Sequence, residues 1–198
     1  DIPETHDAGG DVIPGHTVTR DDGPRAGTTV EALAKLRPAF KPNGTVTAGN
    51  ACPLNDGAAA VLVMSEEKAR ERGLKPRARI VASAAAAVRP EIMGLAPIPA
   101  VKAVLKQAGL KIDDIDLVEL NEAFAAQVLP CRDELDIDPE KLNINGGAIA
   151  LGHPFGMTGA RIMTTLLNNL DSVEGRYGLE SMCVAGGNGM AMIVERLY

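Results

Sequence analysis

Apolar residues occur along the chain in short runs that are separated by polar segments rich in glycine and proline. A continuous apolar run bounded by turn residues is typical of a buried β-strand. Strands are predicted for residues 58–64, 77–88, 116–120, 177–185 and 189–197. The alanine-rich second half of the 77–88 segment is equally compatible with a helix, so the type of that element stays open.

Helical patterns lie between these runs. Ser65 is a good N-cap for the segment "EEKARER", which carries acids first and bases later and is followed by Gly73. Further helices are predicted for residues 29–35, 100–108, 121–129 and 158–170, with Pro99 at the start of the second, Gly109 after it and Pro130 at the end of the third. Strands that alternate with helices indicate an α/β layered domain, here closed by a C-terminal hairpin that turns at residues 186–189.

Composition and charge exclude several function classes. The net charge is −6 and there is no basic cluster, which argues against a nucleic-acid partner. The longest apolar stretch, residues 80–88, is far shorter than the ~20 residues that span a bilayer, so no membrane partner is expected. The three cysteines show neither metal-ligand spacing nor a disulfide framework, which favours a cytoplasmic protein without a metal site.

The first 27 residues are polar and contain many glycines, prolines and aspartates, a composition typical of a surface loop. The sequence opens with Asp1 rather than methionine. We therefore expect the natural polypeptide to begin upstream of this residue.

Four polar clusters stand where predicted strands end or begin. They are "GNACPLNDG" at residues 49–57, "NEAF" at 121–124, "GHPFG" at 152–156 and "CVAGGNG" at 183–189. Ligands of open α/β sheets bind at the carboxyl ends of the strands, where loops lead into helices. The four clusters are therefore predicted to meet at one pocket.

Taken singly, the residues of these clusters allow two interpretations each. His153 is either a general base or a histidine held by backbone hydrogen bonds, and Asn121 is either an oxyanion-binding amide or a helix N-cap; local evidence favours the second interpretation for both. Cys183 is either a small buried apolar residue or a thiol tuned by the N–H groups of the following turn. Cys131 is predicted to be structural. No dinucleotide- or phosphate-binding motif is present, so nucleotide chemistry has no support.

Together and in this order, the motifs "GNACPLNDGAAAVLVMS", "NEAFA", "NGGAIALGHPFGMTGAR" and "CVAGGNGMAMIVER" resemble the C-terminal half of the thiolases, which make or cleave 3-ketoacyl-CoA thioesters. The resemblance runs from about Thr28 to the C-terminus. It implies a layered αβαβα fold, of which this chain supplies a C-terminal half with a mixed sheet covered by helices. The implied domains are the end of the loop domain (1–27), the end of the N-terminal thiolase half (28–76) and the C-terminal thiolase domain (77–198).

The resemblance also implies roles for single residues. His153 matches the histidine that activates the nucleophilic cysteine, Asn121 matches the asparagine that holds a water in the first oxyanion hole, and Cys183 matches the acid/base cysteine. The backbone N–H of Ala185 belongs to the second oxyanion hole. The residues implied to line the substrate and CoA pocket are Cys52, Phe124, Gly147 and Met157.

Three positions depart from the family pattern. The nucleophilic cysteine belongs to the N-terminal half, and neither Cys52 nor Cys131 has its sequence context. Cys52 stands where a serine is typical, and Ala185 stands where a glycine is usual, which is compatible with the oxyanion hole only if the backbone there does not need a positive φ.

The implied activity is cleavage of 3-ketoacyl-CoA by CoA, or the reverse Claisen condensation, as in fatty acid β-oxidation, with the nucleophile supplied by a segment outside this chain. One alternative is a biosynthetic acetoacetyl-CoA-forming thiolase. Another is a ketoacyl synthase of the same fold, although Cys183 argues against it. A third is a non-catalytic module that binds CoA or lipid. CoA and acyl-CoA are expected as substrates, with no permanently bound cofactor. The expected partners are a second copy or three further copies of the protein and the N-terminal half, in the same polypeptide or as a separate subunit.

Overall fold

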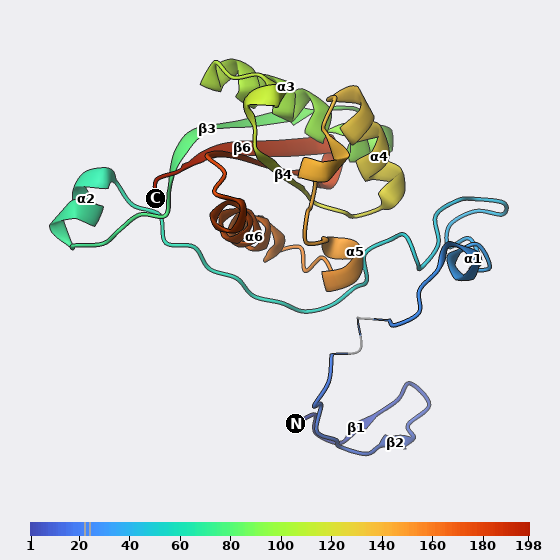
Figure 1. The fold of residues 1–198 in the computed structure, drawn as a ribbon. Helices are drawn as coiled ribbons and strands as arrows, with labels where there is room; N and C mark the ends of the chain where they lie inside the picture. Colours follow the sequence, from blue (N-terminus) through green and yellow to red (C-terminus); the bar gives the residue numbers. More distant parts are fainter. Residues whose placement is uncertain (22, 24) are drawn as a thin grey trace. The chain divides into compact units, whose positions relative to one another are not determined.

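The structure is a computed structural model that describes residues 1–21, 23 and 25–198. Asp22 and Pro24, which belong to the predicted surface loop 1–27, lie outside the described residues. The chain divides into two compact units, Asp1–Lys35 and Leu36–Tyr198. Each unit is considered by itself (Figure 1).

The unit Asp1–Lys35 holds a small hairpin and one helical turn. Strand β1 (Thr5–His6) pairs antiparallel with β2 (Val12–Ile13), so the predicted surface loop contains a short β-ladder. Helix α1 (Val30–Leu33) is capped by the hydroxyl of Thr29 and lies within the predicted helix 29–35. The described residues of the first 27 are all exposed, as a surface loop requires.

The unit Leu36–Tyr198 is built on a four-stranded sheet with helices on both faces (Figure 1). Its α-helices and strands in chain order are α2 (Glu66–Glu71), β3 (Ala78–Ala87), α3 (Pro97–Ala108), β4 (Leu117–Leu120), α4 (Ala125–Glu134), α5 (Ala148–Leu151), α6 (Thr158–Val173), β5 (Tyr177–Val184) and β6 (Asn188–Arg196). Short 3-10 segments connect them: η1 (Pro90–Leu95), η2 (Ile112–Asp114), η3 (Pro139–Lys141) and η4 (Ala185–Gly187).

The sheet has the order β3-β6-β5-β4 and is mixed, because β4 runs parallel to β5 while the other neighbours are antiparallel. The predicted C-terminal hairpin is confirmed: β5 and β6 pair from Val184↔Asn188 to Tyr177↔Glu195 around η4. The open question of the alanine-rich segment is resolved in favour of a strand, since β3 pairs with β6 along its whole length. Pairing with a neighbouring strand here overrides the intrinsic helix preference of alanine.

The sheet has a separate cluster of buried apolar side chains on each face, because side chains alternate between the two faces along the strands. Val118 and Ile193 belong to a cluster with α3 and α4, whereas their neighbours Leu117 and Val194 pack against Leu166 and Leu170 of α6. Successive strand residues point to opposite faces, so α3 and α4 cover one face and α6 covers the other. Figure 1 shows α3 and α6 on opposite sides of the sheet. The predicted mixed sheet covered by helices is confirmed.

One predicted strand is wrong. Residues 58–64 form no strand, and most of their side chains are exposed, including Leu62 at 79%. A strand needs a hydrogen-bonded neighbour, and no segment of the described residues pairs with this run. The adjacent helix α2 does form as predicted, with the hydroxyl of Ser65 accepting a hydrogen bond from the backbone N–H of Lys68.

The helix predicted for residues 121–129 is shifted. Helix α4 begins at Ala125, and it continues through Pro130 to Glu134. Residues 121–124 are drawn into an extended path because Phe124 forms an antiparallel bridge with Ala51. Similarly, α3 begins two residues before the predicted Pro99, at Pro97, and ends as predicted at Gly109, whose φ of 68° is the left-handed value that terminates helices.

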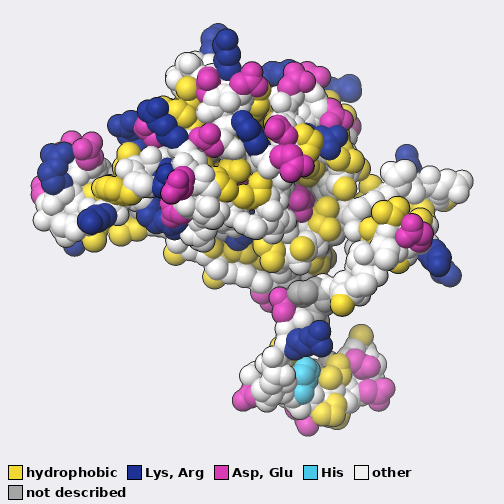
Figure 2. Space-filling model, viewed as in Figure 1, with side chains coloured by type: hydrophobic (Ala, Val, Ile, Leu, Met, Phe, Trp, Pro, Cys, Tyr) yellow, Lys and Arg dark blue, Asp and Glu magenta, His cyan; other side chains and the backbone are white. Residues whose placement is uncertain are grey.

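The charged side chains of one face can be followed in Figure 2. Basic and acidic side chains are interspersed on the face shown in Figure 2 rather than separated by sign. No helix of the described residues is both long and apolar enough to cross a membrane.

Candidate active site

Backbone hydrogen bonds bring the first two polar clusters together. The N–H of Cys52 donates to the carbonyl of Ala123 (3.1 Å), and the N–H of Ala125 donates to the carbonyl of Asn50 (2.9 Å). The loop around Cys52 therefore runs antiparallel to the segment that leads into α4. This pairing explains why Asn121 is not the N-cap of the helix: Phe124 occupies that position.

The cluster of residues 152–156 reaches the same loop. The side-chain amide of Asn55 donates to the carbonyl of Leu151 (3.3 Å), and Gly57 packs so closely against Pro154 and Met157 that a Cβ atom there would lie 2.8 Å and 2.9 Å from their side chains. Cys52 is close enough to Cys183 to contribute to a raised pKa of that thiol. The structure thus brings the clusters of residues 121–124 and 152–156 to the loop 50–57, and the charge of Cys52 acts on Cys183.

His153 follows α5 in a turn that only glycine permits. Gly152 has φ 94°, and a Cβ at this position would lie 2.1 Å from the amide atoms of Asn55. The imidazole is buried, with 8% of the residue exposed, and its ring meets Phe155 edge-on at 5.0 Å. Burial, followed by the positive charge of Arg161, lowers the pKa of His153. The histidine is therefore neutral at neutral pH, as a general base must be.

A buried threonine determines which imidazole nitrogen carries the proton. The hydroxyl of Thr158, in the first turn of α6, donates to the carbonyl of Pro154 (2.9 Å) and lies 2.6 Å from His153 Nδ1. A hydroxyl has a single hydrogen, so with that hydrogen on Pro154 its oxygen must accept from an Nδ1–H group. The lone pair of the neutral imidazole is then on Nε2.

Asn121 lies at the end of β4 and is 1% exposed. Its backbone N–H donates to the carbonyl of Ser181 (2.9 Å), which continues the pairing of β4 with β5. Its side-chain Oδ1 faces the guanidinium of Arg161 at 3.4 Å. The Nδ2 group is buried and has no acceptor among the described residues, so it is a donor that a bound water or substrate oxygen could use.

Cys183 ends the buried part of β5, opposite Gly189 of β6. Burial is the main cause that raises the pKa of this thiol, which keeps it protonated at neutral pH. The turn that follows contains Ala185 in helical conformation and Gly186 at φ 78°. The backbone at Ala185 therefore does not need a positive φ, because the positive φ falls on its neighbour Gly186.

The remaining cysteines occupy different environments. Cys131 is fully buried between α4 and the sheet, where its Sγ lies 3.4 Å from the carbonyl of Gly94 and burial raises its pKa to about 11. Its predicted structural role agrees with this position. Cys52 is half-buried in the loop that joins the clusters, and burial raises its pKa as well.

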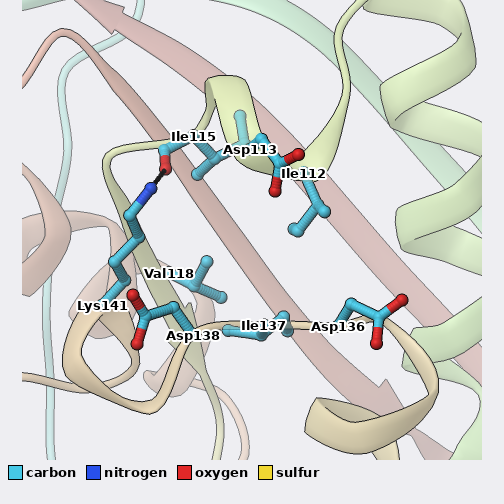
Figure 3. A pocket seen from close by; sticks show the side chains of 8 residues that line it. All are labelled: Ile112, Asp113, Ile115, Val118, Asp136, Ile137, Asp138 and Lys141. Atoms are coloured by element: carbon cyan, nitrogen blue, oxygen red, sulfur yellow. Dashed lines mark hydrogen bonds between the residues drawn. The ribbon is translucent and has the colours of Figure 1, made fainter.

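Two hollows of the described residues lie outside the group of His153 and Cys183. An open apolar groove of about 610 Å³ includes Phe124, the one predicted pocket residue that lines it, and its ring packs edge-to-face on Phe40 at 5.8 Å. A cavity of about 30 Å³ lies between η2 and η3, where Lys141 Nζ donates to the carbonyl of Ile115 at 2.8 Å (Figure 3). No predicted site residue lines this second cavity.

Comparison with known proteins identifies the family. The model of the thiolase C-terminal domain matches residues 74–196, and that of the thiolase N-terminal domain matches residues 4–67. The chain belongs to the thiolase family. It is 54% identical over 182 residues to a β-ketoadipyl-CoA thiolase of Acinetobacter baylyi, covering 91% of this chain and 45% of that protein. It is 53% identical over 197 residues to a 3-ketoacyl-CoA thiolase of Vibrio vulnificus, covering 98% of this chain and 50% of that protein.

Solved thiolase structures have the same fold. The acetyl-CoA acetyltransferase of Bacillus anthracis matches with a TM-score of 0.87 and 51% identity, over 90% of this chain and 45% of that one. Human mitochondrial 3-ketoacyl-CoA thiolase in complex with CoA matches with a TM-score of 0.84 and 46% identity, again over 90% of this chain and 45% of that one. This thiolase chain spans about half the length of the curated relatives that it matches.

Sequence reasoning missed a layer of charged residues in this thiolase chain. Glu119 of β4 and Glu180 of β5 are neighbours across the sheet, and burial raises their pKa values to about 7 and about 8. Arg161 of α6 is the cation that interacts with both. A glutamate in the middle of each of two otherwise apolar strands was the available signal, since charged residues are rarely buried unless paired. Thr158 carried no such signal, because its role depends on the position of His153.

Proposed function

We propose that this chain is the C-terminal part of an enzyme that cleaves 3-ketoacyl-CoA with CoA to acyl-CoA and acetyl-CoA, or runs the reverse Claisen condensation. The names of the relatives support this reaction class, and the effect of Arg161 on both Asn121 and His153 supports the location of its chemistry. The proposal includes a nucleophilic cysteine from a segment outside these 198 residues.

In the first half-reaction, Nε2 of His153 takes the proton of the nucleophilic thiol. The thiolate then attacks the 3-keto carbon, and the bond between C2 and C3 breaks. The electron pair remains on C2 as the enolate of acetyl-CoA, which takes the proton of the Cys183 thiol. An acyl thioester on the nucleophilic cysteine and free acetyl-CoA result. Nδ2 of Asn121 assists by holding the water that binds the developing oxyanion.

In the second half-reaction, the Cys183 thiolate takes the proton of an incoming CoA thiol. The CoA thiolate attacks the acyl thioester, and the nucleophilic cysteine leaves with a proton from His153. Both side chains have then returned to their starting protonation states. The N–H of Ala185 contributes to the second oxyanion hole, and Cys52, Phe124, Gly147 and Met157 contact the acyl and pantetheine groups.

The observation that carries the proposal is the state of His153. Its Nδ1 is committed to Thr158, its Nε2 is the free basic nitrogen, and burial together with Arg161 keeps the ring neutral. A histidine that served packing alone would need neither the neutral state nor an unpaired basic nitrogen. The protonated thiol of Cys183 supplies the acid that the same reaction requires.

The first experiment measures the intact mass of the protein as it occurs in the cell and then its thiolysis of 3-ketoacyl-CoA. We expect His153→Ala and Cys183→Ala each to lower kcat by about 100-fold or more, on the order of what a general acid or base contributes. His16→Ala, at an exposed histidine of the unit Asp1–Lys35, is the matched control. Full activity of both site variants would refute the roles assigned to them.

A biosynthetic, acetoacetyl-CoA-forming thiolase is the second candidate, and the likeness to an acetyl-CoA acetyltransferase favours it. The ratio of kcat/KM for acetoacetyl-CoA to that for longer 3-ketoacyl-CoA substrates separates the two. Binding of CoA without turnover by the complete protein would instead identify a non-catalytic module. Light scattering on the same sample tests the expected homodimer or homotetramer, and cell fractionation tests the expected cytoplasmic location.

A further inference from the structure

Arg161 lies on α6 among three carboxylates that come from other elements. Glu119 belongs to β4, Glu122 follows β4, and Glu180 belongs to β5; each of them acts on the charge of Arg161. Guanidinium groups keep their proton inside proteins, so this site contains a permanent cation that is half-buried. Its Nε and Nη1 atoms are buried and have no hydrogen-bond partner among the described residues.

Two of the three carboxyl groups are fixed by hydrogen bonds, whereas Oε2 of Glu180 is buried and has no partner among the described residues. Glu119 accepts from the side-chain amide of Asn169 (2.9 Å). Glu122 accepts from the amide of Asn143 (2.9 Å) and from the backbone N–H of Ile149 (3.1 Å). Glu119 and Glu122, whose charges act on Arg161, therefore have few alternative positions.

The side-chain hydrogen bond that Arg161 makes among the described residues is to the amide of Asn121. Arginine has five N–H donors and no acceptor, so the amide atom that faces it must be the oxygen. The distance of 3.4 Å from Nη2 to Oδ1 has this polarity. Because the amide is planar, fixing Oδ1 on the arginine side turns Nδ2 to the opposite side, where it has no acceptor among the described residues.

We propose that Arg161 is a positioning residue, which fixes the amide of Asn121 so that its N–H groups face the reacting oxygen. The catalytic consequence rests on the proposed function, whereas the orientation of the amide does not. A neutral side chain in place of Arg161 would accept either orientation of the amide, and only one of them presents a donor. Asn121 alone therefore does not determine the oxyanion-binding geometry.

Arg161 has a second effect on the same site. Its positive charge is one of the two causes that lower the pKa of His153, the other being burial. The charged groups that face Arg161 in turn are Glu119, Glu122 and Glu180. Removing the cation raises the pKa of the imidazole, so the acidic limb of the pH–rate profile moves to higher pH. A purely structural arginine would leave that limb in place.

The test compares Arg161→Gln and Asn121→Ala with the double variant in the complete protein, using thiolysis of 3-ketoacyl-CoA. We expect Arg161→Gln to lower kcat about 10- to 100-fold, the range that a misplaced catalytic group costs, with KM changed less than threefold. The double variant should be no slower than Asn121→Ala alone. Arg161→Lys retains the charge against the carboxylates and should fold even if Arg161→Gln does not.

The matched control is Arg77→Gln. Arg77 also pairs with α6, through Asn168 (2.9 Å) and Asp171 (2.5 Å), but its side chain is about half exposed. Its activity and pH profile should equal those of the unchanged protein. Losses that multiply in the Arg161/Asn121 double variant, or an unchanged acidic limb in Arg161→Gln, would overturn the proposal.

A readout without turnover separates this proposal from the proposed function. Nuclear Overhauser contacts of the Asn121 Nδ2 protons report which way the amide points in the folded protein. We expect these contacts to change in Arg161→Gln and to persist in Arg77→Gln and in Arg161→Lys, because lysine also has only donors to offer to Oδ1. If the unchanged protein shows no thiolysis, the proposed function fails, while the contacts still decide the role of Arg161; identical contacts in all variants refute it.

Discussion

The substitution Thr158→Val tests the hydrogen bond that fixes the tautomer of His153. Valine has nearly the shape of threonine and lacks the hydroxyl. The carbonyl of Pro154 stays satisfied after this change, because the backbone N–H groups of Met157 (2.9 Å) and Thr158 (3.1 Å) also donate to it. The loss therefore falls on one group, the Nδ1–H of a histidine that is 8% exposed.

An unpaired buried donor costs about 1–3 kcal/mol, so we expect a comparable fall in the free energy of unfolding. The same bond favours the Nδ1–H tautomer by about 1 kcal/mol, and every 1.4 kcal/mol is a factor of ten. Thiolysis kcat/KM of Thr158→Val should therefore fall by up to about fivefold. ¹⁵N NMR of His153 should show part of the proton population moving from Nδ1 to Nε2.

Two control variants accompany this measurement. Thr158→Ser retains the hydroxyl and should keep the tautomer. Thr164→Val removes the same kind of hydroxyl-to-carbonyl bond from the same helix, here to Ala160 at 2.8 Å, with no histidine beside it. If Thr158→Val shows the tautomer of the unchanged protein and activity within twofold of Thr164→Val, the reasoning on the hydroxyl hydrogen is refuted.

Two further predictions concern stability. The pKa of Glu180 is raised to about 8 by burial and by Glu119. The contribution of this group to stability is therefore fully present below about pH 4.5 and is lost as the pH rises through 8. Glu180→Gln should reduce the fall in Tm between pH 5 and pH 8, and an unchanged dependence of Tm on pH would contradict this. Leu166→Ala removes a fully buried side chain between α6 and the sheet and should cost about 2–5 kcal/mol in chemical denaturation, whereas a loss below 1 kcal/mol would indicate that the core on this face is loosely packed.

Features that depend on neighbouring residues could be predicted from the sequence. The cap that Ser65 provides for α2, the end of α3 at Gly109 and the hairpin between β5 and β6 all follow from interactions over a few residues. The four polar motifs also lie where strand ends were predicted, and the structure brings three of them together. Their order was informative enough to indicate the family, although single residues such as Asn121 pointed to the wrong local role.

Features that depend on a distant partner could not be predicted. The loop around Cys52 converts residues 121–124 from helix to extended chain, and the pairing with β6 makes the alanine-rich β3 a strand. Residues 58–64 have the composition of a strand, yet no described segment pairs with them. In each case the hydrogen-bonding partner lies far away in the sequence, and local propensity is too weak to determine the outcome without it.

By itself, the sequence determined the α/β class, most helices and the identities of the residues that can carry acid–base chemistry, because hydrophobic period, capping and side-chain chemistry are local properties. Only the tertiary structure determined which imidazole nitrogen of His153 is basic, which way the amide of Asn121 faces and that the charge of Arg161 acts on both Glu119 and His153. These properties arise from hydrogen bonds and charges between segments that fold together, and their strength depends on burial, which no single segment possesses alone.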